Sequence, residues 1–165
     1  MKGMSFFIAV VAAYLVLAGT AYAGINEDVS LHKNCKVCGM SREEFAYSRV
    51  LIEYDNGTTV ATCSTRCAAL DLAMNIGRVP KSVKVGDFNS RTLIDAEKAY
   101  WVIGGKKEGT MSARGKWAFL KKSEAESFIS RNGGKPGTFQ NTLKASFEDL
   151  YRDLKMFWAS MKRNQ

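Results

Sequence analysis

Histidine is almost absent from this sequence of 165 residues, where His32 is the single one. Catalytic centres that combine a nucleophile with a general acid and base most often use histidine to carry the proton. No such set of residues assembles around His32, so we expect a protein that is not an enzyme. Three residues before Cys35, His32 can instead be a surface residue, a metal ligand or a pH-sensitive release element.

Cysteine is also scarce, with four residues that form two tight pairs. Cys35 and Cys38 lie on a turn ending in Gly39-Met40, and Cys63 and Cys67 have the spacing of one helical face. No histidine follows Cys38, which excludes covalent haem attachment. Four thiolates are enough for a closed tetrahedral metal site.

The sequence has one apolar run near its start, from Phe6 to Leu17, and this run is shorter than the roughly 20 residues that a bilayer span needs. Lys2 precedes it and Ala21-Tyr22-Ala23 follows it. This order is typical of a secretory signal peptide, so we expect residues 1–23 to be cleaved after Ala23 and the chain to reach the periplasm. An uncleaved anchor is the alternative. Since no cysteine follows Ala23, a lipid-anchored start is not indicated.

Export places the four thiols in an oxidising compartment, where two disulfides are an alternative to a metal. Disulfides stabilise most when they close long loops, and pairing within either motif closes almost nothing. Pairing between the motifs stays open. Thiol exchange is a third interpretation, but no βαβ pattern surrounds the first pair. The spacing favours metal.

Acidic residues are outnumbered, which gives a formal net charge of +8. The aromatic residues are not interleaved with the basic ones as a stacking platform for nucleic acid requires, so we expect no nucleic-acid partner. Anionic lipid or an acidic protein is the partner that the charge would suit, unless it serves solubility alone.

The segment around the cysteines predicts a compact metal-binding unit. After an extended leader over residues 24–34, strands are expected from Tyr47 to Tyr54 and from Thr58 to Thr62, joined by a type I′ turn at Asp55-Asn56-Gly57. A helix should follow, capped by Thr62, Cys63 or Ser64 and closed by Gly77. The hairpin would return Cys63 to the end where Cys38 lies, as in a treble clef. A purely structural zinc site is the plain alternative.

The second half repeats this logic without cysteine. Four strands are predicted, over Ser82–Phe88, Arg91–Ile94, Ala99–Ile103 and Lys116–Leu120. A helix should start at a capping box of Ser123 and Glu126 and end at Gly133. Met111, in a polar loop between strands, is either a packing residue or a soft-metal ligand.

From Phe139 onward, apolar residues recur at three- or four-residue steps, which predicts one amphipathic helix. The stripe comprises Leu143, Phe147, Leu150, Leu154, Phe157 and Met161. Such a helix could dock on the domain or on a second subunit. Its basic end, with Lys155, Lys162 and Arg163, also suits a partner protein or a membrane surface.

These motifs together resemble the NosL family of exported copper-binding accessory proteins for the assembly of nitrous oxide reductase. The resemblance covers roughly residues 30–135 and includes Cys35-x-x-Cys38-Gly39-Met40, the Met111 loop and the Lys116-Trp117-Ala118-Phe119 strand. The second cysteine pair is similar to the TRASH/YHS type of knuckle. Many members of the NosL family are lipoproteins, and this chain departs from them in lacking the cysteine that would carry the lipid.

The resemblance implies an α+β fold of two related β-β-α-β halves, about 30–80 and 81–135, within a domain spanning 24–135, with the helix of 136–165 outside it. It implies Cu(I) as the metal, with Cys38, Met40 and Met111 in the family's ligand positions. Thiolate and thioether sulfur are soft ligands that select Cu(I), whereas zinc would leave both methionines unused. Zn(II) bound by Cys35, Cys38, Cys63 and Cys67 is the alternative. The implied partner is an acceptor copper protein or a membrane copper-handling complex.

Overall fold

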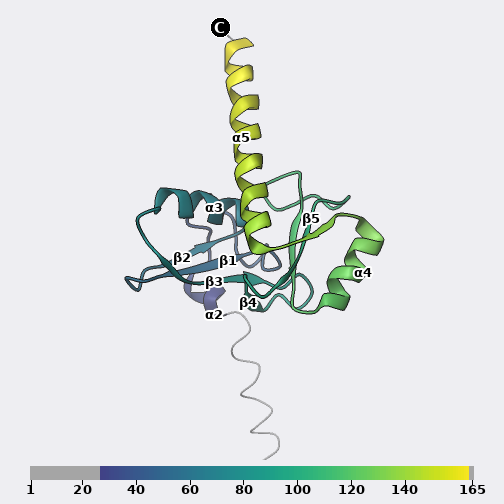
Figure 1. Ribbon diagram of the computed structural model, residues 1–165. Coiled ribbons are helices and arrows are strands. Elements are labelled where there is room, and N and C mark those ends of the chain that lie inside the picture. The colour runs from purple at the N-terminus through teal and green to yellow at the C-terminus, as the bar shows by residue number, and fades with distance from the viewer. Residues whose placement is uncertain (1–26, 164–165) are drawn as a thin grey trace, which may run out of the picture.

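The computed structural model describes residues 27–163, so the expected signal peptide and its cleavage site lie outside the described part. The fold is α+β, as predicted, with two small antiparallel sheets and a long C-terminal helix (Figure 1). The first part contains α2 (Glu27–Leu31), β1 (Val50–Tyr54), β2 (Thr59–Thr62), α3 (Thr65–Met74), β3 (Pro80–Gly86) and β4 (Leu93–Asp95). The second contains β5 (Tyr100–Ile103), β6 (Lys116–Phe119), α4 (Lys122–Asn132), β7 (Lys135–Gly137) and α5 (Phe139–Arg163).

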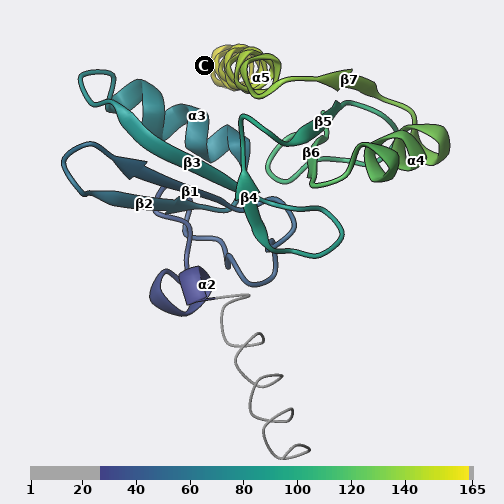
Figure 2. The ribbon, with the colours of Figure 1, turned by 60° about the horizontal axis from the view of Figure 1, so that its bottom comes forward.

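The two sheets share one topology. The first has the order β2-β1-β3-β4 and the second has the order β6-β5-β7, so each contains a β-β-α-β unit with its first strand in the middle. Figure 2 shows α3 lying along the first sheet and α4 beside the second. β3 and β4 pair within the first sheet, which places the division between the halves after Asp95 rather than at residue 81.

The β1–β2 hairpin forms as expected, with Val50 opposite Thr62. Its turn differs from the predicted type I′, which needs a positive φ at both central residues. Gly57 has a φ of 79°, whereas Asn56 does not share the left-handed conformation. The Gly57 amide donates to Tyr54 O, and the result is a three-residue loop.

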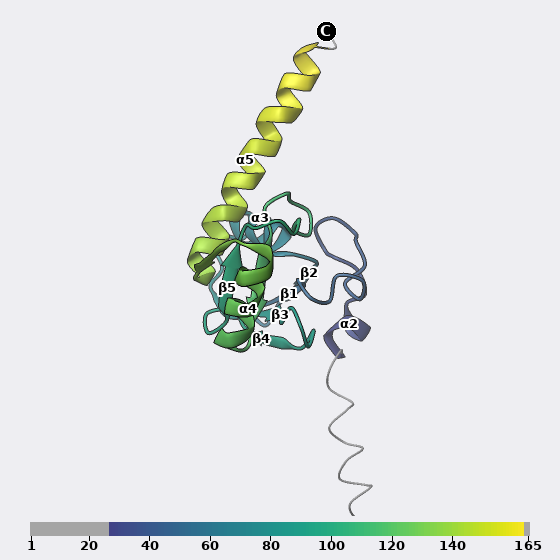
Figure 3. The same ribbon diagram turned by 90° about the vertical axis from the view of Figure 1, so that its right-hand side faces the viewer.

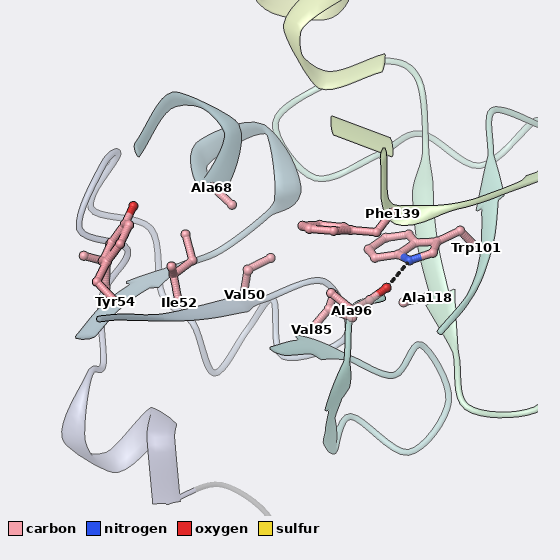
Figure 4. Packing of buried hydrophobic residues seen from close by; sticks show 10 residues of the cluster. Val50, Ile52, Tyr54, Ala68, Val85, Ala96, Trp101, Ala118 and Phe139 are labelled. Carbon is pink, nitrogen blue, oxygen red and sulfur yellow. Dashed lines mark hydrogen bonds between the residues drawn. The ribbon is translucent and has the colours of Figure 1, made fainter. Parts of the chain in front are cut away.

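The core of the first half lies between α3 and β1, because alternate residues of β1 point toward the helix. Val50, Ile52 and Tyr54 are all buried, and Ala68 of α3 packs with them (Figure 4). Ser64 caps α3, one of the three predicted residues. The helix ends at an Asn75 cap, so the predicted closure by Gly77 is wrong: Asn75 already bonds Asp71 O through its backbone and its amide.

Two further local predictions are wrong. Residues 27–31 are helical rather than extended, with Glu27 and Asp28 in the first turn, where acidic groups interact favourably with the helix dipole. α4 begins one residue before the predicted cap Ser123, and its N-cap Lys121 makes no side-chain capping bond. Glu126, which the prediction has reaching back to the cap, pairs instead with Lys122 at 3.6 Å.

The C-terminal helix begins at Phe139, as predicted, and its first turns lie against α3 and β5. Its remaining turns extend beyond both sheets (Figure 3). Within residues 27–163, no helix is long and apolar enough to cross a membrane.

Trp101 of β5 packs in one buried cluster with Val50 and Val85 of the first sheet, so it joins the two halves and offers a direct test of this architecture. It is 1% exposed, donates from Nε1 to Ala96 O at 2.8 Å and stacks on Phe139 (Figure 4). We expect Trp101→Ala to lower the free energy of unfolding by about 3–5 kcal/mol in urea titrations, because it leaves a large cavity. Trp158→Ala is the matched control, since Trp158 is 55% exposed. Equal effects of the two substitutions would contradict the assignment of the core.

Candidate metal centre

The structure brings the four cysteines of the two motifs together. Their sulfur atoms all lie within 4.8 Å of one another. Cys38 Sγ is 3.4 Å from Cys63 Sγ, and Cys63 Sγ is 3.8 Å from Cys67 Sγ. Tetrahedral coordination with metal–sulfur bonds of about 2.3 Å would separate neighbouring sulfurs by about 3.8 Å. The cluster therefore has the dimensions of a site for one ion.

The first pair is presented by a tight knuckle. The Cys35 amide donates to Met40 O and the Gly39 amide donates to Cys35 O, which closes the turn around the two thiols. Gly39 has a φ of 78°, a left-handed conformation that residues with a side chain rarely adopt. The Lys36 amide donates to Ala61 O, so the knuckle is bonded to β2 two residues before Cys63.

The second pair lies at the start of α3. Cys63 precedes the Ser64 cap, and the Cys67 amide donates to Ser64 Oγ. This position gives the sulfurs the partial positive charge of a helix N-terminus, which stabilises thiolates. Cys63 and Cys67 are 0% and 1% exposed, and Cys35 is 3% exposed. Cys38 alone among the four is half-buried.

The thiols interact strongly with one another. Hydrogen bonds from Cys63 and Cys67 lower the pKa of Cys35, against the opposing effect of burial. Hydrogen bonds with Cys35 and Cys67 raise the pKa of Cys63, and the hydrogen bond with Cys35, together with burial, raises the pKa of Cys67 to about 12. The cluster therefore places its first negative charge on one buried sulfur, and a metal ion that binds there must displace the protons of the other thiols.

Two fully buried arginines follow the knuckle in the sequence. Arg42 and Arg49 both bind Asp28, with nitrogen–oxygen distances of 2.6 and 2.8 Å. Arg42 also donates to Thr62 O, next to Cys63, and to the carbonyls of Asp28 and His32. Its guanidinium therefore ties α2, the knuckle and β2 together.

This group carries more positive than negative charge, with two guanidinium groups and one carboxylate. Burial lowers the pKa of Arg42, whereas the bond to Asp28 and, to a smaller extent, the negative charge of Cys35 favour its charged form. A buried cation so placed offsets the charge of the thiolates. Sequence reasoning missed Asp28, Arg42 and Arg49, because nothing in their local pattern separates them from surface charges. The spacing of Arg42 and Arg49, seven residues apart on either side of the apolar Phe45 and Ala46, was the only signal.

The two methionines predicted as ligands both lie near the cysteine cluster, but only Met40 packs against it. Met40 is half-buried and packs against the cysteine cluster. Met111 is 36% exposed on the loop before β6, with a positive φ of 61°. Its neighbour Thr110 hydrogen bonds to Ser48, whose hydroxyl donates to Cys63 O, so this loop is attached beside the cluster.

His32 lies elsewhere. It lines a groove on the other face of the first sheet with Leu51, Thr59 and Lys84. It is not part of the group formed by the four sulfurs. The structure therefore brings together the four cysteines and Met40, holds the Met111 loop nearby and directs His32 away.

Exposure predicts the order in which the thiols react. We expect Cys38 to be alkylated first when the reduced, metal-free protein meets limiting iodoacetamide, because the other three sulfurs are buried. Peptide mapping by mass spectrometry gives the order, and bound metal should protect all four residues. Faster modification of Cys35 or Cys67 would contradict the described burial.

The ion pairs of Asp28 predict a dependence of stability on pH. Burial raises the pKa of Asp28, but the bonds from Arg49 and Arg42 outweigh it and lower the pKa below the ordinary 3.8. The stabilisation is therefore complete above pH 3.8 and is lost as the pH falls through the lower folded value. We expect Asp28→Asn to cost about 3–5 kcal/mol at neutral pH, with a difference from the native chain that shrinks toward pH 2.

Asp153→Asn is the control for this experiment. Asp153 pairs with Arg66 at the surface, where its side chain is 41% exposed, and a pair of this kind contributes at most about 1 kcal/mol. Urea titrations across the pH range measure both variants. A difference for Asp28→Asn that does not change with pH would contradict the assignment.

Comparison with known proteins agrees with this geometry. A family model described as NosL matches residues 26–146. No curated protein matches the chain. The crystal structure of the copper chaperone NosL from Shewanella denitrificans is similar, with 26% sequence identity and a TM-score of 0.53, over 66% of this chain and 88% of that one. The family match covers most of the chain, and the solved structure shares its fold. This chain belongs to the NosL family.

Proposed function

We propose that this protein is an exported Cu(I) chaperone that delivers copper to a periplasmic copper enzyme such as nitrous oxide reductase. The observation that carries the proposal is the cluster of four sulfurs within 4.8 Å of one another, with one of them half-buried. Support for the metal comes from the similar copper chaperone. Support for export and for the acceptor comes from the N-terminal sequence and from the family resemblance.

The chemistry of the donors favours copper. Thiolate sulfur and thioether sulfur are soft, and Cu(I) is the soft ion among common biological metals. Met40 packs against the cysteines, where its thioether can supplement them. Zinc would leave this thioether without a role, because zinc takes thiolate, imidazole or carboxylate ligands.

The uneven burial suits transfer rather than storage. Cys35, Cys63 and Cys67 can hold the ion from the interior, while Cys38 faces the side from which an acceptor can approach. In an exchange, a sulfur of the acceptor binds the copper as Cys38 releases it. The copper stays Cu(I) throughout, so the step needs no oxidant or reductant. The buried arginines limit the negative charge that remains on the three inner thiolates.

A zinc-stabilised interaction module is the second candidate. The specific observation in its favour is that three of the four thiols are almost fully buried, as in closed structural zinc sites. This function predicts unfolding on chelation and no transfer of metal to an acceptor, whereas a chaperone should stay folded without its cargo.

A substitution at Met40 separates the two functions. We expect Met40→Ala to weaken Cu(I) binding about tenfold, the scale on which groups around the direct ligands act, and to leave Zn(II) binding unchanged. Anaerobic titration of the reduced protein against a competing Cu(I) chelator measures the first, and a zinc indicator measures the second. Met74→Ala is the control, because Met74 is 70% exposed at the end of α3.

Two outcomes would overturn the chaperone proposal. One is a site that binds zinc alone and is unaffected by Met40→Ala. The other is Cu(I) that binds but stays with the protein when a dithiol acceptor peptide is added. Circular dichroism after chelation tests the zinc module independently.

A further inference from the structure

The long helix α5 has two faces with different surroundings. One face is seated on the body through small and polar residues, of which Thr142, Ala145, Ser146 and Asp149 are buried. Asp149 accepts from Lys116 and Arg114. Further along, Asp153 pairs with Arg66 of α3 at 2.6 Å. Among the described residues beyond Asp153, none bonds to the body, and the helix continues into solvent (Figure 1).

The apolar stripe of the helix lies on a different face. At about 100° per residue, the residues of the stripe centre about 120° around the axis from the buried face. Phe147 is already 42% exposed beside the body, and the outer residues are 47–61% exposed: Tyr151, Leu154, Phe157, Trp158 and Met161. Phe139 and Leu143, at the start of the helix, pack with the core, and Leu150 is half-buried. From Tyr151 onward the stripe is exposed and contributes little to docking the helix within the chain.

The charges beside the stripe have one dominant sign. Residues 150–163 carry four basic residues and one acidic residue, a net charge of +3. The acidic one, Asp153, is neutralised by Arg66. Lys155 Nζ lies 5.6 Å from the centre of the Tyr151 ring, so lysine borders the aromatic edge of the stripe. Going around the helix, aliphatic residues give way to Tyr151 and Trp158 and then to Lys155 and Lys162.

We propose that the outer part of α5, residues 150–163, binds the surface of an anionic lipid membrane. Aromatic residues with a polar end favour the boundary between acyl chains and headgroups, and lysines beside them can reach anionic headgroups. The excess positive charge complements such a surface. The same three- and four-residue spacing would fit a second copy of this helix. That contact is disfavoured, because it brings together two segments that each carry a net charge of +3 and repel one another. Lying on the surface also agrees with the absence of a membrane-spanning helix among the described residues.

The chain contains its own reporter for this contact. Of its three tryptophans, Trp101 and Trp117 are each 1% exposed and Trp158 is 55% exposed. The chain from Gly24, which contains every described element, is mixed with vesicles of phosphatidylcholine, with or without phosphatidylglycerol. With the anionic vesicles we expect co-sedimentation and a blue shift of tryptophan emission, both decreasing as salt is added.

Two methionines on opposite sides of the helix make a matched pair of variants. Met161 lies on the stripe and is 50% exposed, while Met156 lies off it and is 58% exposed. We expect Met161→Ser to weaken vesicle binding about tenfold and Met156→Ser to have little effect. Replacing Lys155 or Lys162 with Gln should weaken binding to anionic vesicles about fivefold each.

Three results would overturn the proposal. The first is no binding to anionic vesicles at low salt, and the second is equal weakening by both methionine substitutions. The third is a concentration-dependent dimer in sedimentation that Met161→Ser abolishes, which would assign the stripe to a second copy. None of these readouts involves copper, so their failure leaves the chaperone proposal unaffected.

Discussion

The ion pairs of Asp28 with Arg42 and Arg49 are the constraint on which the rest of the metal centre depends. Both guanidinium groups are fully buried, and removing such charges from water is costly unless partners surround them. Asp28 supplies the charge, and backbone carbonyls of Asp28, His32, Ala46 and Thr62 supply further acceptors. Satisfying these donors requires α2, the knuckle and β2 to adopt one arrangement, and that arrangement brings Cys35 and Cys38 to Cys63.

The two halves share the β-β-α-β topology but have different roles. In the first, Cys63 lies just before the cap of the helix that follows the hairpin and Cys67 lies in its first turn, both beside the knuckle. In the second, the equivalent position is held by α4, and a cluster of aromatic side chains around Phe88, Trp117 and Phe128 fills the interior. The loop that carries Met111 extends from this second half to Ser48 of the first. The second half therefore contacts the metal-binding half and supports it through this loop.

The two faces of α5 have different roles. Its polar face is held by charges from α3 and β6, which leaves the apolar face available. The proposed lipid contact and the proposed copper transfer rest on separate groups of residues. If both hold, the chain would present Cys38 to its acceptor from a membrane surface.

The sequence by itself determined the elements whose signals are local. The hairpin followed from β-rich segments flanking Asn56-Gly57, the start of α3 from the capping candidates Thr62, Cys63 and Ser64, and the last helix from its apolar period, because each depends on residues within a few positions. The four cysteines were identified for the same reason. Only the tertiary structure decided that β3 and β4 both belong to the first sheet, that residues 27–31 form a helix, and that Arg42 and Arg49 enter the interior. These outcomes depend on partners 14 to 42 residues away, whose desolvation and charge pairing no local pattern records. For the same reason, the sequence showed that α5 is amphipathic, but only the fold showed that its polar face is the one against the body.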